Sequence, residues 1–309
     1  MKKINKTIFV IEPLFSESKI LRGAIKKTFK RVIFNYGKIN ENQIIRKIKK
    51  VDGIVLGLQP FNKKVISSAK NLKAVAKFGV GMDNVDIKEC FKNKIKIFRA
   101  VGCNSSSVAE VVISNSINLL RKINENHYLM SKGIWHQLNG NDLLGKNFGI
   151  IGLGSIGKEV VKRLIAFKCN IFVNDLKIDK KFCKKYNLKI LSKKNIFKKS
   201  DLISIHTPLT KKTEQMINKK TIKLMKNNSI LINTARGKII DLENSIKLIK
   251  SKKIQMYIDV FPNEPYKLKK VMNTKKNIFS PHMTGTSIEA KQRIGIKNII
   301  DLKKFFNEK

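Results

Sequence analysis

Short hydrophobic runs alternate with amphipathic stretches through most of the chain. The runs that predict β-strands in the first third are 7–11, 32–36, 53–57, 73–78 and 94–99. Between them, apolar residues recur at the three- and four-residue spacing of helices over 18–29, 41–50 and 63–70. Strands that alternate with helices predict parallel sheets with helices on both faces, which is an α/β fold.

The pattern changes at residue 105. Apolar positions from 105 to about 132 suit one long, mostly buried helix. Strand-like runs then resume at 147–152, 170–175, 202–206, 229–233, 255–260 and 277–280, and a helical pattern over 287–306 closes the chain. The sequence therefore predicts two doubly wound parallel-sheet domains, with the long helix beginning the second.

Length and composition are those of a globular protein with two domains. The 309 residues are 42% hydrophobic and 28% charged. The chain lacks an apolar run near the ~18 residues of a membrane span, and the run 8–11 is too short for a signal peptide. The four cysteines form no CxxC pair, and the histidines have no metal-ligand spacing. We expect a cytoplasmic protein without disulfides, a metal site or a membrane partner.

The net charge of +43 raises the question of a nucleic-acid partner. Only 8 of the 65 basic residues are arginine, and the lysines are spread along the whole chain. Lysine, isoleucine and asparagine, all abundant here, share A/T-rich codons, so genome composition explains the bias. We expect no specific nucleic-acid partner, although a positive surface would concentrate small anionic substrates.

A glycine-rich turn lies between a predicted strand and a predicted helix at 152–157. Gly152 permits the tight turn, Gly154 lets the backbone approach a pyrophosphate, and Gly157 lets the helix pack close to the strand. The N–H groups of Ser155 and Ile156 would then point at the anion. With a strand before it and a helix after it, this turn predicts a dinucleotide site.

An acidic residue after the following strand identifies the preferred dinucleotide. Asp175 lies 18 residues beyond the last glycine of the turn. A carboxylate there accepts hydrogen bonds from the ribose hydroxyls and repels a 2′-phosphate. The sequence therefore predicts NAD rather than NADP as cofactor.

Three later segments place reactive side chains at predicted strand ends, where open α/β sheets bind ligands. They carry Arg236, Glu264 and His282. A hydroxy-acid oxidation needs a base for the hydroxyl proton, a cation for the carboxylate and an acid that orients the base. Spacing alone does not pair the acid with the histidine, and a surface ion pair, a solvated acid and a buried histidine are the alternative interpretations.

Taken together, the motifs resemble those of the D-isomer-specific 2-hydroxyacid dehydrogenases, most closely the phosphoglycerate dehydrogenase branch. The resemblance covers nearly the whole chain. Its motifs are the glycine turn and the segments 78–86 (Phe-Gly-Val-Gly-Met-Asp-Asn-Val-Asp), 104–110 (Asn-Ser-Ser-Ser-Val-Ala-Glu), 206–209, 233–237, 259–265 and 281–282.

The resemblance implies a role for each matching residue. His282 is the acid/base, Glu264 its partner and Arg236 the substrate clamp. Backbone at Val80 and Gly81 meets the substrate carboxylate. Asn104 lies near the substrate. The cofactor is lined by the residues of the glycine turn and by Asp175, Thr207, Thr234, Ala235 and Asp259.

The resemblance also implies a Rossmann NAD domain, residues 103–283, inserted into a flavodoxin-like substrate domain formed by 1–102 and 284–309. It implies a homodimer that uses the helix at 105–132. The leading substrate is D-3-phosphoglycerate, oxidised to 3-phosphohydroxypyruvate in serine biosynthesis. The alternative is a reductase of glyoxylate, hydroxypyruvate or another 2-keto acid, and a remote one is a non-enzymatic NAD-sensing protein.

One departure from the family pattern concerns the substrate side chain. Phosphoglycerate enzymes often carry an Arg-Ser pair after the third strand, where this chain has Gly57, Leu58, Gln59 and Pro60. A lysine such as Lys77 would have to hold a phosphate instead.

Overall fold

The structure is a computed structural model that describes residues 2–268 and 275–308. The chain divides into two compact units, which we call unit 1 (residues 1–104 with 286–309) and unit 2 (residues 105–285). The sequence predicted these divisions after residues 102 and 283. None of the helices in the described residues is long and apolar enough to cross a membrane.

Unit 1 is a parallel sheet enclosed by helices. Its strands are β1 (Ile4–Val10), β2 (Phe29–Phe34), β3 (Gly53–Leu56), β4 (Ala74–Lys77) and β5 (Lys96–Arg99). Its helices are α1 (Pro13–Glu17), α2 (Lys19–Thr28), α3 (Glu41–Ile48), α4 (Lys63–Ser68), α5 (Ile87–Lys92) and α13 (Ile288–Asn307). The strand order is β2-β1-β3-β4-β5, and every described pairing is parallel.

Alternation along β1 and the residue after it assigns the helices of unit 1 to the two faces of the sheet. Phe9 and Ile11 pack with buried residues of α3, α4 and α5. Ile8 and Val10, which point to the opposite face, pack with α2 and α13. Both sides of the carboxyl-terminal half of β1 are therefore buried, which explains why residues 8–11 form a continuous hydrophobic run.

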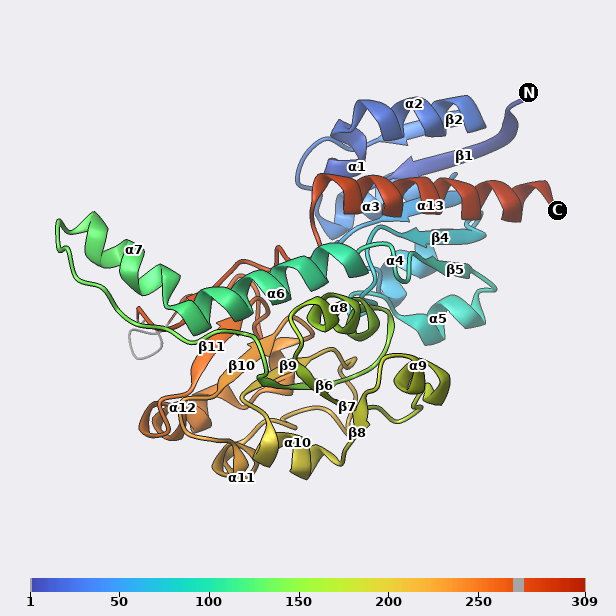
Figure 1. Cartoon of the computed structure of the whole chain (residues 1–309). Helices are drawn as coiled ribbons and strands as arrows, with labels where there is room; N and C mark the ends of the chain where they lie inside the picture. Colours follow the sequence, from blue (N-terminus) through green and yellow to red (C-terminus); the bar gives the residue numbers. More distant parts are fainter. Residues whose placement is uncertain (1, 269–274, 309) are drawn as a thin grey trace. The chain divides into compact units, whose positions relative to one another are not determined.

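Unit 2 contains a second parallel sheet. Its strands are β6 (Asn147–Ile151), β7 (Asn170–Asn174), β8 (Lys189–Ile190), β9 (Leu202–Ile205), β10 (Ile230–Asn233), β11 (Gln255–Ile258) and β12 (Ile278–Phe279). Its helices are α6 (Ser105–Arg121), α7 (Ile123–Ser131), α8 (Ser155–Ala166), α9 (Lys180–Lys185), α10 (Lys193–Lys199), α11 (Lys219–Leu224), α12 (Leu242–Ser251) and the short 3₁₀ helix η1 (Gly237–Ile239). The order is β12-β11-β10-β9-β6-β7-β8 (Figure 1).

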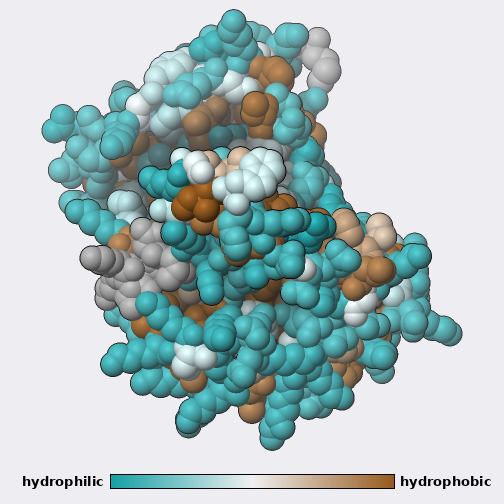
Figure 2. Space-filling model, turned by 60° about the vertical axis from the view of Figure 1, so that its left-hand side comes forward, coloured by the Kyte–Doolittle hydropathy of each residue, from teal (hydrophilic) through white to brown (hydrophobic). Residues whose placement is uncertain are grey.

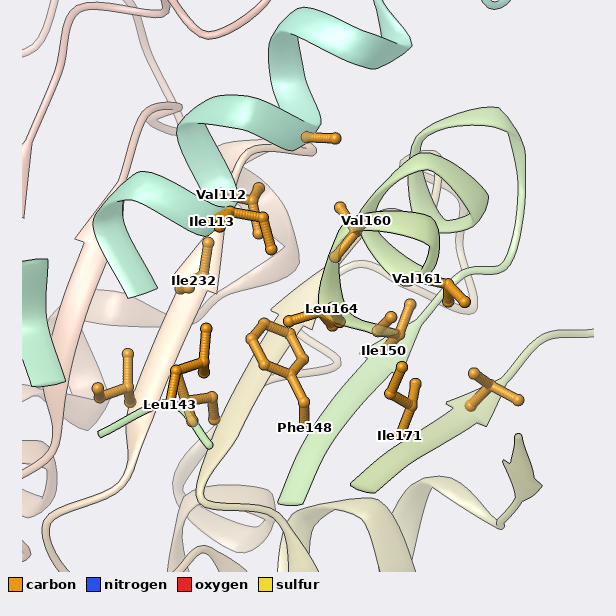
Figure 3. Close-up of a cluster of buried hydrophobic side chains, with 14 of the residues drawn as sticks. Val112, Ile113, Leu143, Phe148, Ile150, Val160, Val161, Leu164, Ile171 and Ile232 are labelled. Carbon is orange, nitrogen blue, oxygen red and sulfur yellow. The ribbon is translucent and has the colours of Figure 1, made fainter. Parts of the chain in front are cut away.

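Helices cover both faces of this sheet as well. Figure 3 shows side chains of α6 and α8, among them Val112 and Val160, packed over Phe148 and Ile150 of β6. Residues of α10, α11 and α12 pack on the other face, against Ile203 and its neighbours. The prediction of two doubly wound parallel-sheet domains, one of them a Rossmann domain, is confirmed.

The single long helix predicted over 105–132 is wrong. α6 ends at Arg121, and Lys122 adopts a left-handed conformation with φ 53° before α7 begins. The side chain of Asn118 accepts a hydrogen bond from the N–H of Asn124 across this break (3.0 Å). The second segment therefore leaves the axis of the first, and α7 has no buried residue.

Candidate active site

The glycine turn joins β6 to α8, as the sequence predicted. Gly152 has φ +102°, and a Cβ there would lie 2.6 Å from the carbonyl of His206. A Cβ on Gly157 would overlap the carbonyl oxygen of Gly152. A Cβ on Gly154, in contrast, would have no atom within 4 Å of it, so the backbone there faces open space that a ligand can enter.

The first turn of α8 is suited to an anion. Its N-cap, Gly154, supplies no side-chain hydrogen bond. Ser155 is exposed and Ile156 half-buried. Their N–H groups lie at the positive end of a twelve-residue helix, where a phosphate binds favourably.

Asp175 is hydrogen-bonded to the glycine turn. It directly follows β7, and its carboxylate accepts hydrogen bonds from the N–H of Leu153 (2.6 Å) and of Lys177 (3.0 Å). Each carboxylate oxygen has a second lone pair, so acceptor capacity is left for hydroxyl groups. The structure thus places the predicted ribose acceptor beside the predicted pyrophosphate site.

Buried polar atoms at the neighbouring strand ends lack hydrogen-bond partners. Oγ1 of Thr207, Oγ1 of Thr234 and Nδ1 of His206 are buried and make no hydrogen bond to any described residue. His206 and Thr207 follow β9, which lies next to β6 where the order of the sheet reverses, and this switch point is where such sheets bind ligands. Unsatisfied buried polar groups are costly, and a polar cofactor would satisfy them. These residues fit NAD.

His206 is unsuited to proton transfer. Its Nε2 lies 2.9 Å from Oγ of Ser204, and burial lowers its pKa to about 3. The imidazole is therefore neutral throughout the physiological range. Ala235 is half-buried, and its N–H donates to Oδ1 of Asn233 (3.0 Å).

Glu264 and His282 form a hydrogen-bonded pair. Oε2 of Glu264 lies 2.7 Å from Nδ1 of His282, although 18 residues separate them. The other oxygen, Oε1, accepts from the N–H of Phe261 (2.9 Å), which fixes the carboxylate. Because Nδ1 is engaged, Nε2 is the ring nitrogen that can exchange a proton with a substrate. The imidazole side chain is 43% exposed, so a ligand can reach it.

Arg236 lies at the same edge of the sheet as this pair. It follows β10, Glu264 follows β11 and His282 follows β12, and these three strands are adjacent and parallel. Asn233 holds the loop by donating from Nδ2 to the carbonyl of Arg236 (3.0 Å). The edge therefore carries an imidazole, a carboxylate and a guanidinium on neighbouring strand ends.

Asp259 has a structural role that the sequence did not reveal. It is fully buried and accepts hydrogen bonds from Oγ of Ser280 (2.5 Å), the N–H of Met283 (2.8 Å), and the N–H (3.1 Å) and Oγ1 (2.6 Å) of Thr284. Oγ of Ser280 in turn lies 2.7 Å from the hydroxyl of Tyr257, whose pKa burial raises to about 12. One carboxylate therefore anchors the loop that carries His282. The only sign of this anchoring in the sequence was an acid at the end of a hydrophobic run, followed later by a loop rich in hydroxyl groups.

The predicted residues of unit 1 lie beyond the ends of its strands. Val80 and Gly81 follow β4 and are half-buried, and the carbonyl of Val80 accepts two hydrogen bonds from the guanidinium of Arg99 (3.2 and 2.8 Å). Asn104 ends the first stretch of unit 1. The described residues contain no cluster of three metal-ligating side chains.

Comparisons with known proteins show which family the chain resembles. Residues 113–284 match the family described as D-isomer specific 2-hydroxyacid dehydrogenase, NAD binding domain. The chain is 33% identical over 278 residues to a hydroxypyruvate reductase of Thermotoga maritima. This alignment covers 87% of this chain and 89% of the reductase. The chain is also 33% identical over 262 residues to a D-3-phosphoglycerate dehydrogenase of Methanocaldococcus jannaschii, covering 83% of this chain and 50% of the longer relative.

Solved structures share the whole architecture. An NAD⁺-bound 3-phosphoglycerate dehydrogenase in Entamoeba histolytica superimposes with a TM-score of 0.82 at 25% identity, covering 98% of this chain and 96% of that one. A glyoxylate reductase from Paecilomyes thermophila gives a TM-score of 0.87 at 23% identity, with coverages of 98% and 95%.

Proposed function

We propose that this chain, which belongs to the D-isomer-specific 2-hydroxyacid dehydrogenases, acts through Arg236, Glu264 and His282. It is an NAD-dependent 2-hydroxyacid oxidoreductase. The observation that carries this proposal is the 2.7 Å contact between Glu264 and His282 at a strand edge shared with Arg236. A histidine oriented by a carboxylate is a suitable acid/base near neutral pH.

Each of the three residues has a distinct part in the proposed reaction. Nε2 of His282 takes the hydroxyl proton during oxidation of the acid and returns it during reduction of the keto acid. Glu264 holds Nδ1–H and stabilises the imidazolium that forms. Arg236 binds the substrate carboxylate with two parallel hydrogen bonds and polarises the oxygen at C2. When NAD is bound, its nicotinamide accepts the hydride from C2 of the acid.

The substrate is proposed at two levels. The first is the class of D-2-hydroxy acids and the matching 2-keto acids. Within it, the sequence favours D-3-phosphoglycerate, with glyoxylate or hydroxypyruvate as the alternative, and relatives of each kind have similar identity to this chain. Assays of phosphorylated and unphosphorylated acids with NAD, and of the keto acids with NADH, test both levels. Failure of every acid to reduce NAD would refute the proposed activity.

Asp175 is proposed to determine the cofactor preference. Replacing Asp175 with Ala removes the acceptor for the ribose hydroxyls and the charge that repels a 2′-phosphate. We expect the ratio of kcat/KM for NAD over NADP to fall roughly 10- to 150-fold, since about 1.5–3 kcal/mol is typical of hydrogen bonds to charged groups. Steady-state kinetics with both cofactors measure this ratio. Asp142→Ala, an exposed acid in the same unit, is the control. An unchanged ratio would show that Asp175 does not read the ribose.

We further propose that the chain forms a homodimer through the arm consisting of α7 and residues 132–135. Four apolar side chains of this arm are exposed, namely Ile123, Met130, Ile134 and Trp135. In Figure 2, where the side of the molecule that carries α7 comes forward, hydrophobic and near-neutral side chains gather near the centre of a face that is mostly hydrophilic. Such patches on soluble proteins commonly mark interfaces.

Light scattering tests the proposed dimer. The wild type should have about twice the 35.3 kDa mass of one chain. Trp135→Glu should weaken association at least about tenfold, because an aromatic anchor would be replaced by a charge at the interface. Phe91→Glu alters an equally exposed aromatic residue of unit 1 and should leave the mass unchanged. A monomeric wild type would refute the proposal.

A further inference from the structure

Tyr257 is a buried tyrosine whose hydroxyl reaches the loop that carries His282. It belongs to β11, is 1% exposed and packs in the cluster that contains Val108 and Val112 of α6. Its hydroxyl oxygen lies 2.7 Å from Oγ of Ser280. Packing alone does not require a hydroxyl group here, and the reaction described above gives this one no part.

The hydrogen bonds that begin at Tyr257 run in one direction. Oγ of Ser280 lies 2.5 Å from Oδ1 of Asp259, and a carboxylate can only accept, so the single hydroxyl proton of Ser280 points to Asp259. Oγ of Ser280 must then accept from Tyr257. Burial raises the pKa of Tyr257 to about 12, so the phenol keeps its proton throughout the physiological range. Tyr257, Ser280 and Asp259 therefore form a hydrogen-bond chain with a fixed polarity.

This hydrogen-bond chain ends on the backbone around His282. His282 has φ +54°, a left-handed conformation that costs free energy in a residue with a side chain and persists only where its surroundings impose it. Its N–H donates to the carbonyl of Asp259 (2.8 Å). The N–H groups of Met283 (2.8 Å) and Thr284 (3.1 Å) donate to the Asp259 carboxylate. Three successive N–H groups are thus bound to one residue, so the position of Asp259 determines how the imidazole is presented.

The Asp259 carboxylate depends in turn on all of its donors. It is fully buried, Oδ1 accepts from Ser280 and Met283, and Oδ2 accepts twice from Thr284. A buried acceptor that loses a donor is costly, because water cannot replace it. The bond from Tyr257 fixes the Ser280 side chain, and hydrogen bonds linked in series strengthen one another at low dielectric. The whole arrangement lies within unit 2.

We propose that Tyr257 is a positioning residue for the acid/base: its hydroxyl holds Ser280 toward Asp259 and thereby holds His282 in the orientation that proton exchange requires. This inference rests on the activity proposed above. Tyr257 acts only through the loop and takes no proton from the substrate itself. Loss of its hydroxyl should therefore slow turnover and leave the dinucleotide site unchanged.

Tyr257→Phe removes the hydroxyl and keeps the ring that packs against α6. We expect kcat to fall roughly 3- to 10-fold, the range of one ordinary hydrogen bond, with the affinity for NADH unchanged. In a His282→Ala background the same substitution should change the residual kcat by less than about twofold, since no imidazole is left to position. A fold that is merely weakened would lose activity in both backgrounds. Tyr186→Phe, at a half-buried tyrosine of the same unit, should leave kcat unchanged.

Hydrogen exchange measured by mass spectrometry gives a readout that does not depend on turnover. In Tyr257→Phe, the amides of Met283 and Thr284 should exchange roughly 3- to 10-fold faster, because their common acceptor is less firmly held. Peptides from the glycine turn should keep their wild-type rates. Ser280→Ala removes the intermediate hydroxyl and should also speed exchange at these amides. Adding Tyr257→Phe to it should have no further effect, because both residues act through one hydrogen-bond chain.

The outcomes separate this inference from the proposed activity. A folded Tyr257→Phe with wild-type kcat, or with an equal loss in both backgrounds, would overturn the inference and leave the activity intact. If Tyr257→Phe does not fold, Ser280→Ala is judged by the same comparison. Wild-type turnover of His282→Ala would overturn both proposals. If no acid is turned over, the activity fails and exchange decides the inference: faster exchange confined to the His282 loop supports it, and unchanged exchange there overturns it.

Discussion

Replacing His282 with Ala is expected to lower kcat by about 10²- to 10⁴-fold, the usual contribution of a positioned acid/base. The substituted enzyme has no group at the Nε2 position to take the hydroxyl proton. NAD affinity should stay within about twofold, because the imidazole is hydrogen-bonded to Glu264 and lies apart from the glycine turn in the chain. Steady-state kinetics give kcat, and fluorescence titration with NADH gives the cofactor affinity.

Two further substitutions serve as a control and a comparison for His282→Ala. His127→Ala removes an exposed histidine of α7 and should keep wild-type turnover. Glu264→Gln retains a hydrogen-bonding partner for Nδ1 but removes the charge that stabilises the imidazolium, so its turnover should fall between those of the wild type and His282→Ala. A wild-type turnover number for His282→Ala would remove this histidine from the proposed mechanism.

Replacing Arg236 with Gln is expected to lower kcat/KM for the acid roughly 30- to 1000-fold, corresponding to a loss of about 2–4 kcal/mol for one partner of a charge pair. The substrate carboxylate would lose both hydrogen bonds of the guanidinium fork. Arg236→Lys should recover only part of the loss, since an ammonium supplies the charge without the planar, bidentate geometry. Steady-state kinetics with the best acid of the substrate series measure both variants.

The control for this position is an arginine elsewhere in unit 2. Arg121 lies at the end of α6, where its guanidinium is 3.8 Å from Asp142 and its side chain is 58% exposed. Arg121→Gln should leave kcat/KM near the wild-type value. If Arg236→Gln did the same, the carboxylate clamp would have to be assigned to another cation.

The alternation of hydrophobic runs was sufficient to predict the class of fold. Strands buried on both faces, such as β3, β9 and β10, are apolar at every position or at all but one, the exceptions being Ser204 and Asn233. The edge strand β8 escaped prediction because its two residues, Lys189 and Ile190, are exposed and carry no alternating pattern. The break after α6 escaped because Lys122 is neither glycine nor proline.

Local sequence singled out the residues proposed to react but not how they meet. The glycine turn is defined by neighbouring residues, and so its geometry followed from the motif. The pairing of Glu264 with His282 depends on two loops after adjacent strands, a relation that spacing in the sequence does not contain. The anchoring of the His282 loop by Asp259 is non-local in the same way, because the acceptor and its donors are 21 to 25 residues apart.

The interruption of unit 1 by unit 2 affects how the protein is made on the ribosome. β1 to β5 are translated first, but Ile299, Leu302 and Phe306 of α13, which cover one face of their sheet, follow only after all of unit 2. At roughly 5–20 residues per second, the delay amounts to tens of seconds or less. During that time one face of the nascent sheet is covered only in part, by α1 and α2, so the emerging chain is an expected client of ribosome-associated chaperones.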